Sequence, residues 1–176
     1  MPSMLFAQDA PNKGGRLVVA ADSEPRNLNP AIVASNGVFF ISSKVVEPLA
    51  EASFDGEGGL DGRLATSWEG SEDGLTATFK LREGVKWHDG KPFTSADVLF
   101  SFKQYLPVTF ARTKLIMEQV ASIDAPDALT VVFKLKQSYP AFMYILEATG
   151  GTIMPKHLYE GVTDYRTTQV NNNIVG

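Results

Sequence analysis

The sequence predicts a mixed α/β (α+β) fold that contains at least one patch of antiparallel sheet. Two segments, 75–82 and 129–136, alternate apolar and polar residues with a period of two, as half-buried antiparallel strands do. Between them, residues 94–106 carry apolar side chains at the three- and four-residue spacing of a helix. Short strands and helices that follow one another along a single chain favour this fold class.

Composition narrows the range of functions. The chain has 176 residues, of which 44% are hydrophobic and 20% charged, and its formal net charge is −4. Such a chain can bury an apolar core, so a disordered or fibrous protein is not expected. A weakly negative charge offers no basic field to a polyanion, so nucleic acid is not an expected partner. Cysteine is absent from the sequence, which excludes disulfides, thiolate metal sites and a cysteine nucleophile.

Residues 1–14 are expected to be a signal remnant and flexible lead-in. Residues 1–8 are apolar and rich in small side chains, like the last part of a secretory signal, but they lack its basic start and full apolar stretch. A frayed terminus is the alternative interpretation. No window of about 18 apolar residues occurs, so no membrane-spanning helix is expected.

The first regular elements are predicted within residues 16–49. The apolar run 16–21 is typical of a buried strand. Two prolines in 23–30 then exclude helix and central strand. From residue 36 or 37, apolar residues recur at helical spacing, which predicts a helix as far as Glu47, before Pro48. Residues 55–62 include four glycines and are expected to form a loop.

The two predicted strands resemble each other. Residues 73–82 and 127–136 are identical at six of ten positions. Such a pair can come from an internal duplication or from two strands that fit the same pleated surface. With only two copies, the second interpretation is favoured.

The segment between these strands has the clearest helix signal. Thr94 can cap the first turn, Asp97 stands three residues later where a capping-box acid belongs, and Pro107 is expected to end the helix. The remaining predicted elements, in chain order, are a helix over 109–120, a short helix after Pro140, a brief strand at Ile153 and Met154, and one turn over 155–159.

Few residues could support catalysis. The sequence has 2 histidines: His88 lies in a Trp-His-Asp-Gly string typical of a tight turn, and His157 has no partner at metal-ligand spacing. Residues 56–61 approach a G-x-G-x-x-G fingerprint but end in Asp, with no helix to follow. The carboxylates at 69–73 stand beside glycines, where a solvated turn explains them better than an acid/base pair does. We therefore expect no enzyme, no metal and no cofactor.

A ligand-binding loop is expected where the region of the first strand meets the first helix. Small side chains there let a ligand reach backbone N–H and C=O groups, and loops outside strand ends are where open α/β sheets place ligands. The alternative is that Ser35 or Asn36 only caps the helix. The residues of this candidate loop are Val33, Ala34, Ser35, Asn36, Gly37 and Val38.

Residues 64–102 contain a long ordered string of short motifs. These motifs are Ala65, Ser67-Trp68, Asp73-Gly74-Leu75, Leu81-Arg82, Gly84-Val85, Trp87-His88-Asp89-Gly90, Pro92-Phe93-Thr94, Asp97-Val98 and Phe100-Ser101. The string resembles the signature of the family 5 extracellular solute-binding proteins, the peptide- and nickel-binding group that serves ABC importers. Residues 17–30 and 153–157 resemble further pieces of the same family.

The resemblance implies the N-terminal part of a two-lobed periplasmic binding protein of type II, with a small antiparallel accessory subdomain. Residues 15–50 would begin lobe I, 51–150 would form the accessory subdomain, and 151–176 would return to a truncated lobe I. Family members are much longer, so the opposing lobe is expected to be missing from this chain. Lobe closure on a ligand, a hinge motion, would need that lobe.

The resemblance also implies a function. The protein would be the periplasmic solute-binding component of an ABC importer, which captures a small peptide or peptide-like solute and delivers it to a membrane permease. Main-chain pairing to the candidate loop would hold part of the ligand, while the pieces 87–90 and 94–97 would serve folding of the accessory subdomain. Nickel chelate, opine, oligosaccharide and haem stay open as ligands.

The expected partners are the solute and the permease complex at the inner membrane, and the expected state is a monomer. The expected location is the periplasm, without a lipid anchor because the chain has no cysteine. Two functions of other classes stay open: a signalling or chaperone-like interaction module, and a small hydrolase.

Overall fold

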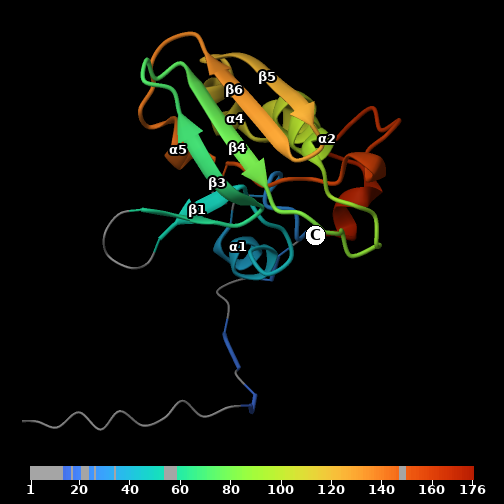
Figure 1. Ribbon diagram of the computed structural model, residues 1–176. Helices are drawn as coiled ribbons and strands as arrows, with labels where there is room; N and C mark the ends of the chain where they lie inside the picture. The colour runs from blue at the N-terminus through green and yellow to red at the C-terminus, as the bar shows by residue number, and fades with distance from the viewer. Residues whose placement is uncertain are drawn as a thin grey trace, which may run out of the picture.

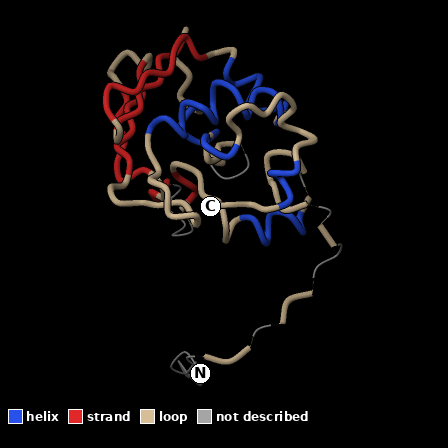
Figure 2. The backbone as a smooth tube through the Cα atoms, turned by 90° about the vertical axis from the view of Figure 1, so that its right-hand side faces the viewer, coloured by secondary structure: helices blue, strands red, loops and turns tan. Residues whose placement is uncertain are grey.

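A computed structural model describes residues 14–16, 18–20, 24–25, 27–33, 35–53, 59–146 and 150–176. Its main body is a four-stranded antiparallel sheet with helices packed on one face (Figures 1 and 2). A two-stranded sheet and helix α1 lie beyond one end of the large sheet (Figure 1). The mixed α/β prediction with antiparallel sheet is confirmed. Residues 1–13 of the predicted leader lie outside the described residues.

The large sheet contains both predicted strands. Its strands, in spatial order, are β3 (Ala65–Gly70), β4 (Thr76–Leu81), β6 (Thr130–Leu135) and β5 (Val120–Asp127), and all neighbours are antiparallel. The two similar predicted strands, now β4 and β6, are direct neighbours, with Phe79 opposite Val131. Their alternating apolar residues, Phe133 included, are buried on one face. Leu75 lies just outside β4 and is exposed.

One helical rod crosses the covered face of the sheet. It consists of α2 (Ser95–Phe100), a π-helical turn η1 (Ser101–Tyr105) and α3 (Leu106–Thr109), and α4 (Ala111–Met117) follows. The predicted capping box is confirmed, because Thr94 N donates to Asp97 Oδ2 over 2.9 Å and the Thr94 side chain accepts from the first turn.

Pro107 does not end the helix, so that prediction is wrong. In the π-helical turn, Leu106 N–H reaches back five residues to the carbonyl of Ser101. Pro107 then occupies an early position of the next helical segment, where a missing N–H is tolerated. The helix therefore continues to Thr109, whose hydroxyl donates to the carbonyl of Tyr105 over 2.9 Å.

Helix α1 (Asn36–Ser42) stops short of the predicted end at Glu47. Beyond a turn, the backbone is used for tertiary rather than helical hydrogen bonds: Glu47 O accepts from Ile153 N over 3.1 Å, and Leu49 O accepts from Ala65 N over 2.9 Å. Burial of Leu49 draws the chain into the core, whereas Ile41, one of the apolar residues on which the helix prediction rested, is exposed. Core contacts outweigh the local helical pattern here.

The strand predicted over 16–21 is not formed by its described residues, Arg16 and 18–20. Val18 and Val19 are 76% and 71% exposed. A strand needs a neighbour for its backbone groups, and neither described sheet places one beside this segment. Residues 17 and 21 lie outside the described residues.

Two further predictions need correction. Residues 60–62 of the predicted loop form β2 (Leu60–Gly62), paired antiparallel with β1 (Ala50–Ala52), while the loop's residues 55–58 lie outside the described part. Ile153 and Met154 are buried but do not form a strand. Instead of a strand partner, the Ser101 side chain meets the backbone there, since Met154 N donates to Ser101 Oγ over 2.8 Å.

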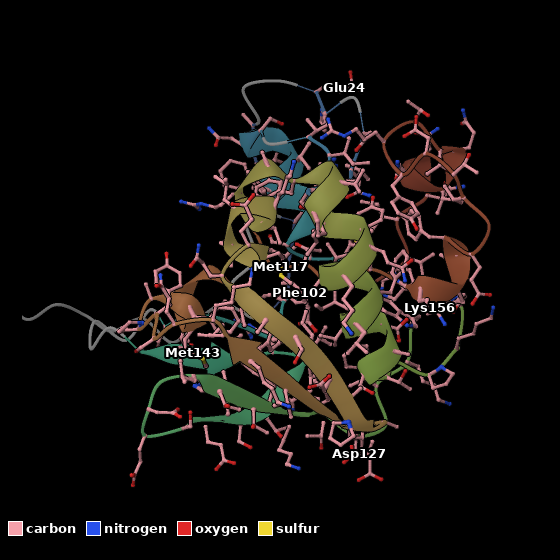
Figure 3. All side chains as sticks on the ribbon, turned by 90° about the horizontal axis from the view of Figure 1, so that it is seen from above. Glu24, Phe102, Met117, Asp127, Met143 and Lys156 are labelled. Atoms are coloured by element: carbon pink, nitrogen blue, oxygen red, sulfur yellow. The ribbon has the colours of Figure 1, made fainter. Side chains whose placement is uncertain are left out.

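The last elements are short. Two of them fall in predicted segments: α5 (Phe142–Ile145) follows Pro140, and the 3-10 turn η2 (Lys156–Leu158) lies within 155–159. A further 3-10 turn, η3 (Gln169–Asn172), was not predicted. The core centres on Phe133, whose ring lies 5.3 Å from Phe102, 5.7 Å from Phe79 and 5.2 Å from Phe142 between ring centroids. Figure 3 shows Phe102 between the helical layer and the sheet. This aromatic cluster joins the helical rod to the sheet.

Candidate functional site

The candidate loop runs into helix α1 and offers little side-chain surface. Val33 and Ser35 are half-buried, Asn36 is exposed, and Gly37 and Val38 are buried. Ala34 lies outside the described residues. A ligand at this loop would therefore meet chiefly the backbone and the Asn36 side chain.

Ser35 caps α1, which is the alternative that the sequence left open. Its backbone is extended, with φ −139° and ψ 154°, and its Oγ accepts from Val38 N over 3.4 Å. Capping does not occupy the backbone N–H of Asn36, the first helical residue. The cap and a ligand-binding loop are thus compatible.

Asn29 anchors the chain just before the candidate loop, and sequence reasoning did not single it out as a site residue. It is fully buried. Its main-chain carbonyl accepts from Ile32 N over 3.2 Å and from Val33 N over 3.1 Å, and its Oδ1 accepts from Ala31 N over 3.0 Å. The turn that delivers the chain to the candidate loop is therefore built on Asn29.

The amide nitrogen of Asn29 enters a buried polar network. Asn29 Nδ2 donates to Tyr105 Oη over 2.8 Å and to Asn171 Oδ1 over 3.0 Å. Tyr105 and Tyr159 both donate to the same Asn171 oxygen, over 3.1 and 3.0 Å. Burial raises the pKa of both phenols, so the network stays uncharged at neutral pH. Its members come from four distant segments, a proximity that no local pattern signals.

A cavity with charged lining residues lies away from the candidate loop. A cavity of about 400 Å³ opens between the end of α1 and the tight turn that follows β4. Its apolar wall includes Trp87 and Phe93, and Lys44, Glu47 and Lys86 contribute charged groups. None of the described cavities is lined by the described residues of the candidate loop. The indole Nε1 of Trp87 is buried with no hydrogen-bond partner among the described residues.

The two histidines lie in turns and make contacts within the fold. His88 lies in the predicted tight turn, which Gly90 closes with a φ of 85° and a 2.8 Å hydrogen bond from its N–H to the carbonyl of Trp87. His157 does have a partner, Asp89, at 2.6 Å. Within the described part of the chain, neither ring forms a hydrogen bond with a serine or threonine hydroxyl, and no three His, Asp or Glu side chains gather as a metal site requires.

The carboxylates at 69–73 are all exposed, as expected, but only two of them lie in a turn. Glu72 and Asp73 belong to the turn, whereas Glu69 lies in strand β3. Asp73 Oδ1 accepts from Ser71 Oγ and, over 2.9 Å, from Leu75 N. These hydrogen bonds lower the pKa of Asp73. A carboxylate engaged in this way closes a turn and is not poised as an acid or base.

Comparison with known proteins identifies the family. Residues 59–176 match the family model described as bacterial extracellular solute-binding proteins, family 5 Middle. The chain belongs to family 5 of the bacterial extracellular solute-binding proteins. The match includes the Trp87–Gly90 turn and the Thr94–Asp97 capping box.

Relatives within the family are named for peptide ligands. The chain is 32% identical over 152 residues to the "Probable D,D-dipeptide-binding periplasmic protein DdpA" of Escherichia coli K12, which covers 84% of this chain and 29% of that protein. It is 32% identical over 137 residues to the glutathione-binding protein GsiB of Escherichia coli O1:K1 / APEC, covering 74% of this chain and 25% of that protein. The chain thus spans about a quarter to a third of these relatives.

Solved structures of the family share the fold. The substrate-binding protein CtaP of Listeria monocytogenes matches with a TM-score of 0.77 and 32% identity over 93% of this chain and 33% of that one. NikZ of Campylobacter jejuni, solved with Ni(L-His), matches with a TM-score of 0.70 and 30% identity over 88% of this chain and 30% of that one. The described residues therefore have the fold of part of a type II periplasmic binding protein. No helix among them is both long and apolar enough to cross a membrane.

Proposed function

We propose that this protein is the periplasmic solute-binding component of an ABC importer, and that it captures a small peptide or peptide-like solute. Membership of family 5 carries this proposal. Relatives named for a D,D-dipeptide and for glutathione favour a peptide ligand. Delivery of the solute to a membrane permease, a periplasmic location, a monomeric state and the absence of catalysis belong to the same proposal.

The division of the chain into parts is also proposed. Residues 15–50 and 151–176 would belong to lobe I, and 51–150 would form the accessory subdomain. Two observations support this division. The carbonyl of Glu47 accepts from Ile153 N, which joins the first and last parts. The four strands of the large sheet, all from the middle part, pair with one another.

Ligand binding at the candidate loop is proposed to use the main chain. Asn36 is the first residue of α1, where its backbone N–H has no helical acceptor, and its side chain is exposed. Ser35 before it is extended. An extended peptide alongside could accept from this N–H, as in other main-chain recognition of peptides.

The substitution Asn36→Pro tests this N–H while keeping the helix. Proline is tolerated at the first helical position, and the extended Ser35 suits a residue before proline. Asn36→Ala is the matched control, since it removes the same side chain and keeps the N–H. In isothermal titration with L-Ala-L-Ala, using the protein as its gene encodes it, we expect Asn36→Pro to bind roughly tenfold more weakly than Asn36→Ala. Equal affinities would remove this N–H from the site.

Titration of the wild-type protein also tests the class of ligand. L-Ala-L-Ala, D-Ala-D-Ala and reduced glutathione represent peptides, while Ni(II)-L-histidine and mannopinic acid represent ligands of structural neighbours in the family. We expect binding by at least one peptide. Binding by only the nickel complex or the opine would replace the peptide proposal.

A further inference from the structure

The helical rod contacts the sheet and the candidate loop's anchor through neighbouring side chains. Phe102 packs against Phe133 of β6, with ring centroids 5.3 Å apart. Tyr105, three residues later and fully buried, accepts from Asn29 Nδ2 over 2.8 Å. Both residues belong to the π-helical turn. One rigid turn therefore connects the large sheet with the segment that leads into the candidate loop.

Every polar group of Asn29 is engaged. Its backbone N–H donates to Asn27 Oδ1 over 2.7 Å, and its carbonyl and Oδ1 organise the turn that ends at Val33. Nδ2 is the group that reaches the rest of the protein, through Tyr105 and Asn171. Because Asn29 is fully buried, these bonds cannot be exchanged for water without opening the structure.

Aromatic packing leaves the Tyr105 ring one position. Its ring centroid lies 4.8 Å from that of Tyr159, 5.3 Å from that of Tyr165 and 5.9 Å from that of Phe100. These contacts use the ring faces and edges, so they would persist without the hydroxyl. Of the Tyr105 side chain, only the hydroxyl forms a hydrogen bond with Asn29.

We propose that Tyr105 is a positioning residue for ligand binding. The helical rod packs on the four-stranded sheet, and through the hydrogen bond from Asn29 to Tyr105 this packed unit holds the candidate loop in its binding conformation. The expected effect on ligand affinity rests on the proposed function. The expected effect of the Tyr105 hydroxyl on opening of the loop does not depend on any ligand.

Two phenylalanine variants separate positioning from general stability. Tyr105→Phe removes the hydroxyl and keeps the ring. Tyr165→Phe is the matched control, because Tyr165 belongs to the same aromatic cluster and no hydrogen bond of its hydroxyl occurs among the described residues. Amide hydrogen exchange is then followed in the free protein, at Ile32, at Val33 and over 36–38, and in strands β4 and β6.

In Tyr105→Phe we expect exchange at these loop amides to be roughly tenfold faster than in Tyr165→Phe, with the strands unchanged. Equal loop exchange in the two variants, or equally faster exchange in the strands, would overturn the proposal. If Tyr105→Phe does not fold, exchange in the free wild-type protein decides instead. We expect the amides of Ile32 and Val33, which donate to the Asn29 carbonyl, to be protected from exchange. Exchange there at the rate of an unprotected chain would overturn the proposal, since nothing would then hold the loop.

Titration with L-Ala-L-Ala completes the test. If the wild type binds this dipeptide, Tyr105→Phe should bind it several-fold more weakly than Tyr165→Phe does, and equal affinities would refute positioning. If the wild type binds no peptide, the proposed function fails, while the exchange result still decides whether Tyr105 controls the loop.

Discussion

His157 Nε2 lies 2.6 Å from Asp89 Oδ2, although 68 residues separate them in the sequence. The contact joins the turn after Trp87 to the 3-10 turn η2. A carboxylate only accepts, so the ring N–H donates. This hydrogen bond is the main cause of a lowered pKa for the Asp89 carboxyl, with a second contribution from Lys91 N.

His157→Ala removes the hydrogen-bond donor and should raise the pKa of the Asp89 carboxyl toward its usual value. The pKa can be followed by NMR titration of the side-chain carboxyl. Asp73 provides the internal control, because its lowered pKa comes from Ser71 and Leu75, far from His157 in sequence. An unchanged Asp89 pKa in the variant would contradict the assigned cause.

The same contact sets a pH dependence of stability. Because folding lowers the pKa of Asp89, its contribution is present above the carboxyl's usual pKa and is lost as the pH falls through the lowered value. We therefore expect the stability difference between the wild type and His157→Ala to shrink on acidification into that range. Chemical denaturation at a series of pH values measures it, and a constant difference would count against the contact.

Asp97 should be the most sensitive polar residue of the helical rod. Its two oxygens accept from Thr94 N and from Lys156 N, each over 2.9 Å, and its side chain is buried. Asp97→Ala leaves both donors without their acceptor, so we expect a loss of about 2–4 kcal/mol in the free energy of unfolding. Thr94→Ala removes only the cap and should cost about 1 kcal/mol. Similar losses for both variants in urea denaturation would contradict this role for Asp97.

Phe133 should dominate the stability of the aromatic core. Its ring is fully buried among Phe79, Phe102 and Phe142. Phe133→Ala opens a cavity there and should cost about 3–5 kcal/mol. Lys134→Ala is the neighbouring control: it removes an exposed ion pair with Asp124 and should change stability by less than about 1 kcal/mol. A small effect of Phe133→Ala in denaturant unfolding would place the core elsewhere.

Two glycines in turns allow backbone strain to be separated from contact. Gly74 and Gly84 have φ values of 67° and 75°, but an added Cβ would lie 2.5 Å from Ser138 Oγ at Gly74 and would meet nothing within 4 Å at Gly84. Alanine should cost about 1–2 kcal/mol at either position from the left-handed backbone alone. Gly74→Ala should cost more, and Ser138→Gly should remove the excess in a double-mutant cycle. If Gly74→Ala and Gly84→Ala cost the same while Ser138 is kept, Ser138 moves aside freely.

The similarity of the two strand segments, 73–82 and 127–136, illustrates how far a local pattern can be extended. It predicted both strands, and in the structure they pair directly with each other in one sheet. It did not predict that their preceding turns differ, since Gly74 has a positive φ and its counterpart Ala128 does not. The strand pattern depends on burial of alternate side chains, whereas the conformation of each turn depends on the neighbouring residues, such as Ser138 beside Gly74.

Local patterns were enough to predict the fold class, strands β4 and β6 and the Thr94 capping box, because periodic burial and capping involve residues close together in the chain. The family could be predicted from a string of short motifs. Other features depend on how distant segments pack. The tertiary structure decided that α1 ends where backbone groups near Glu47 and Leu49 find distant partners. It also decided that Asn29 meets Tyr105 and that His157 meets Asp89, since such contacts depend on which segments the folded core brings together.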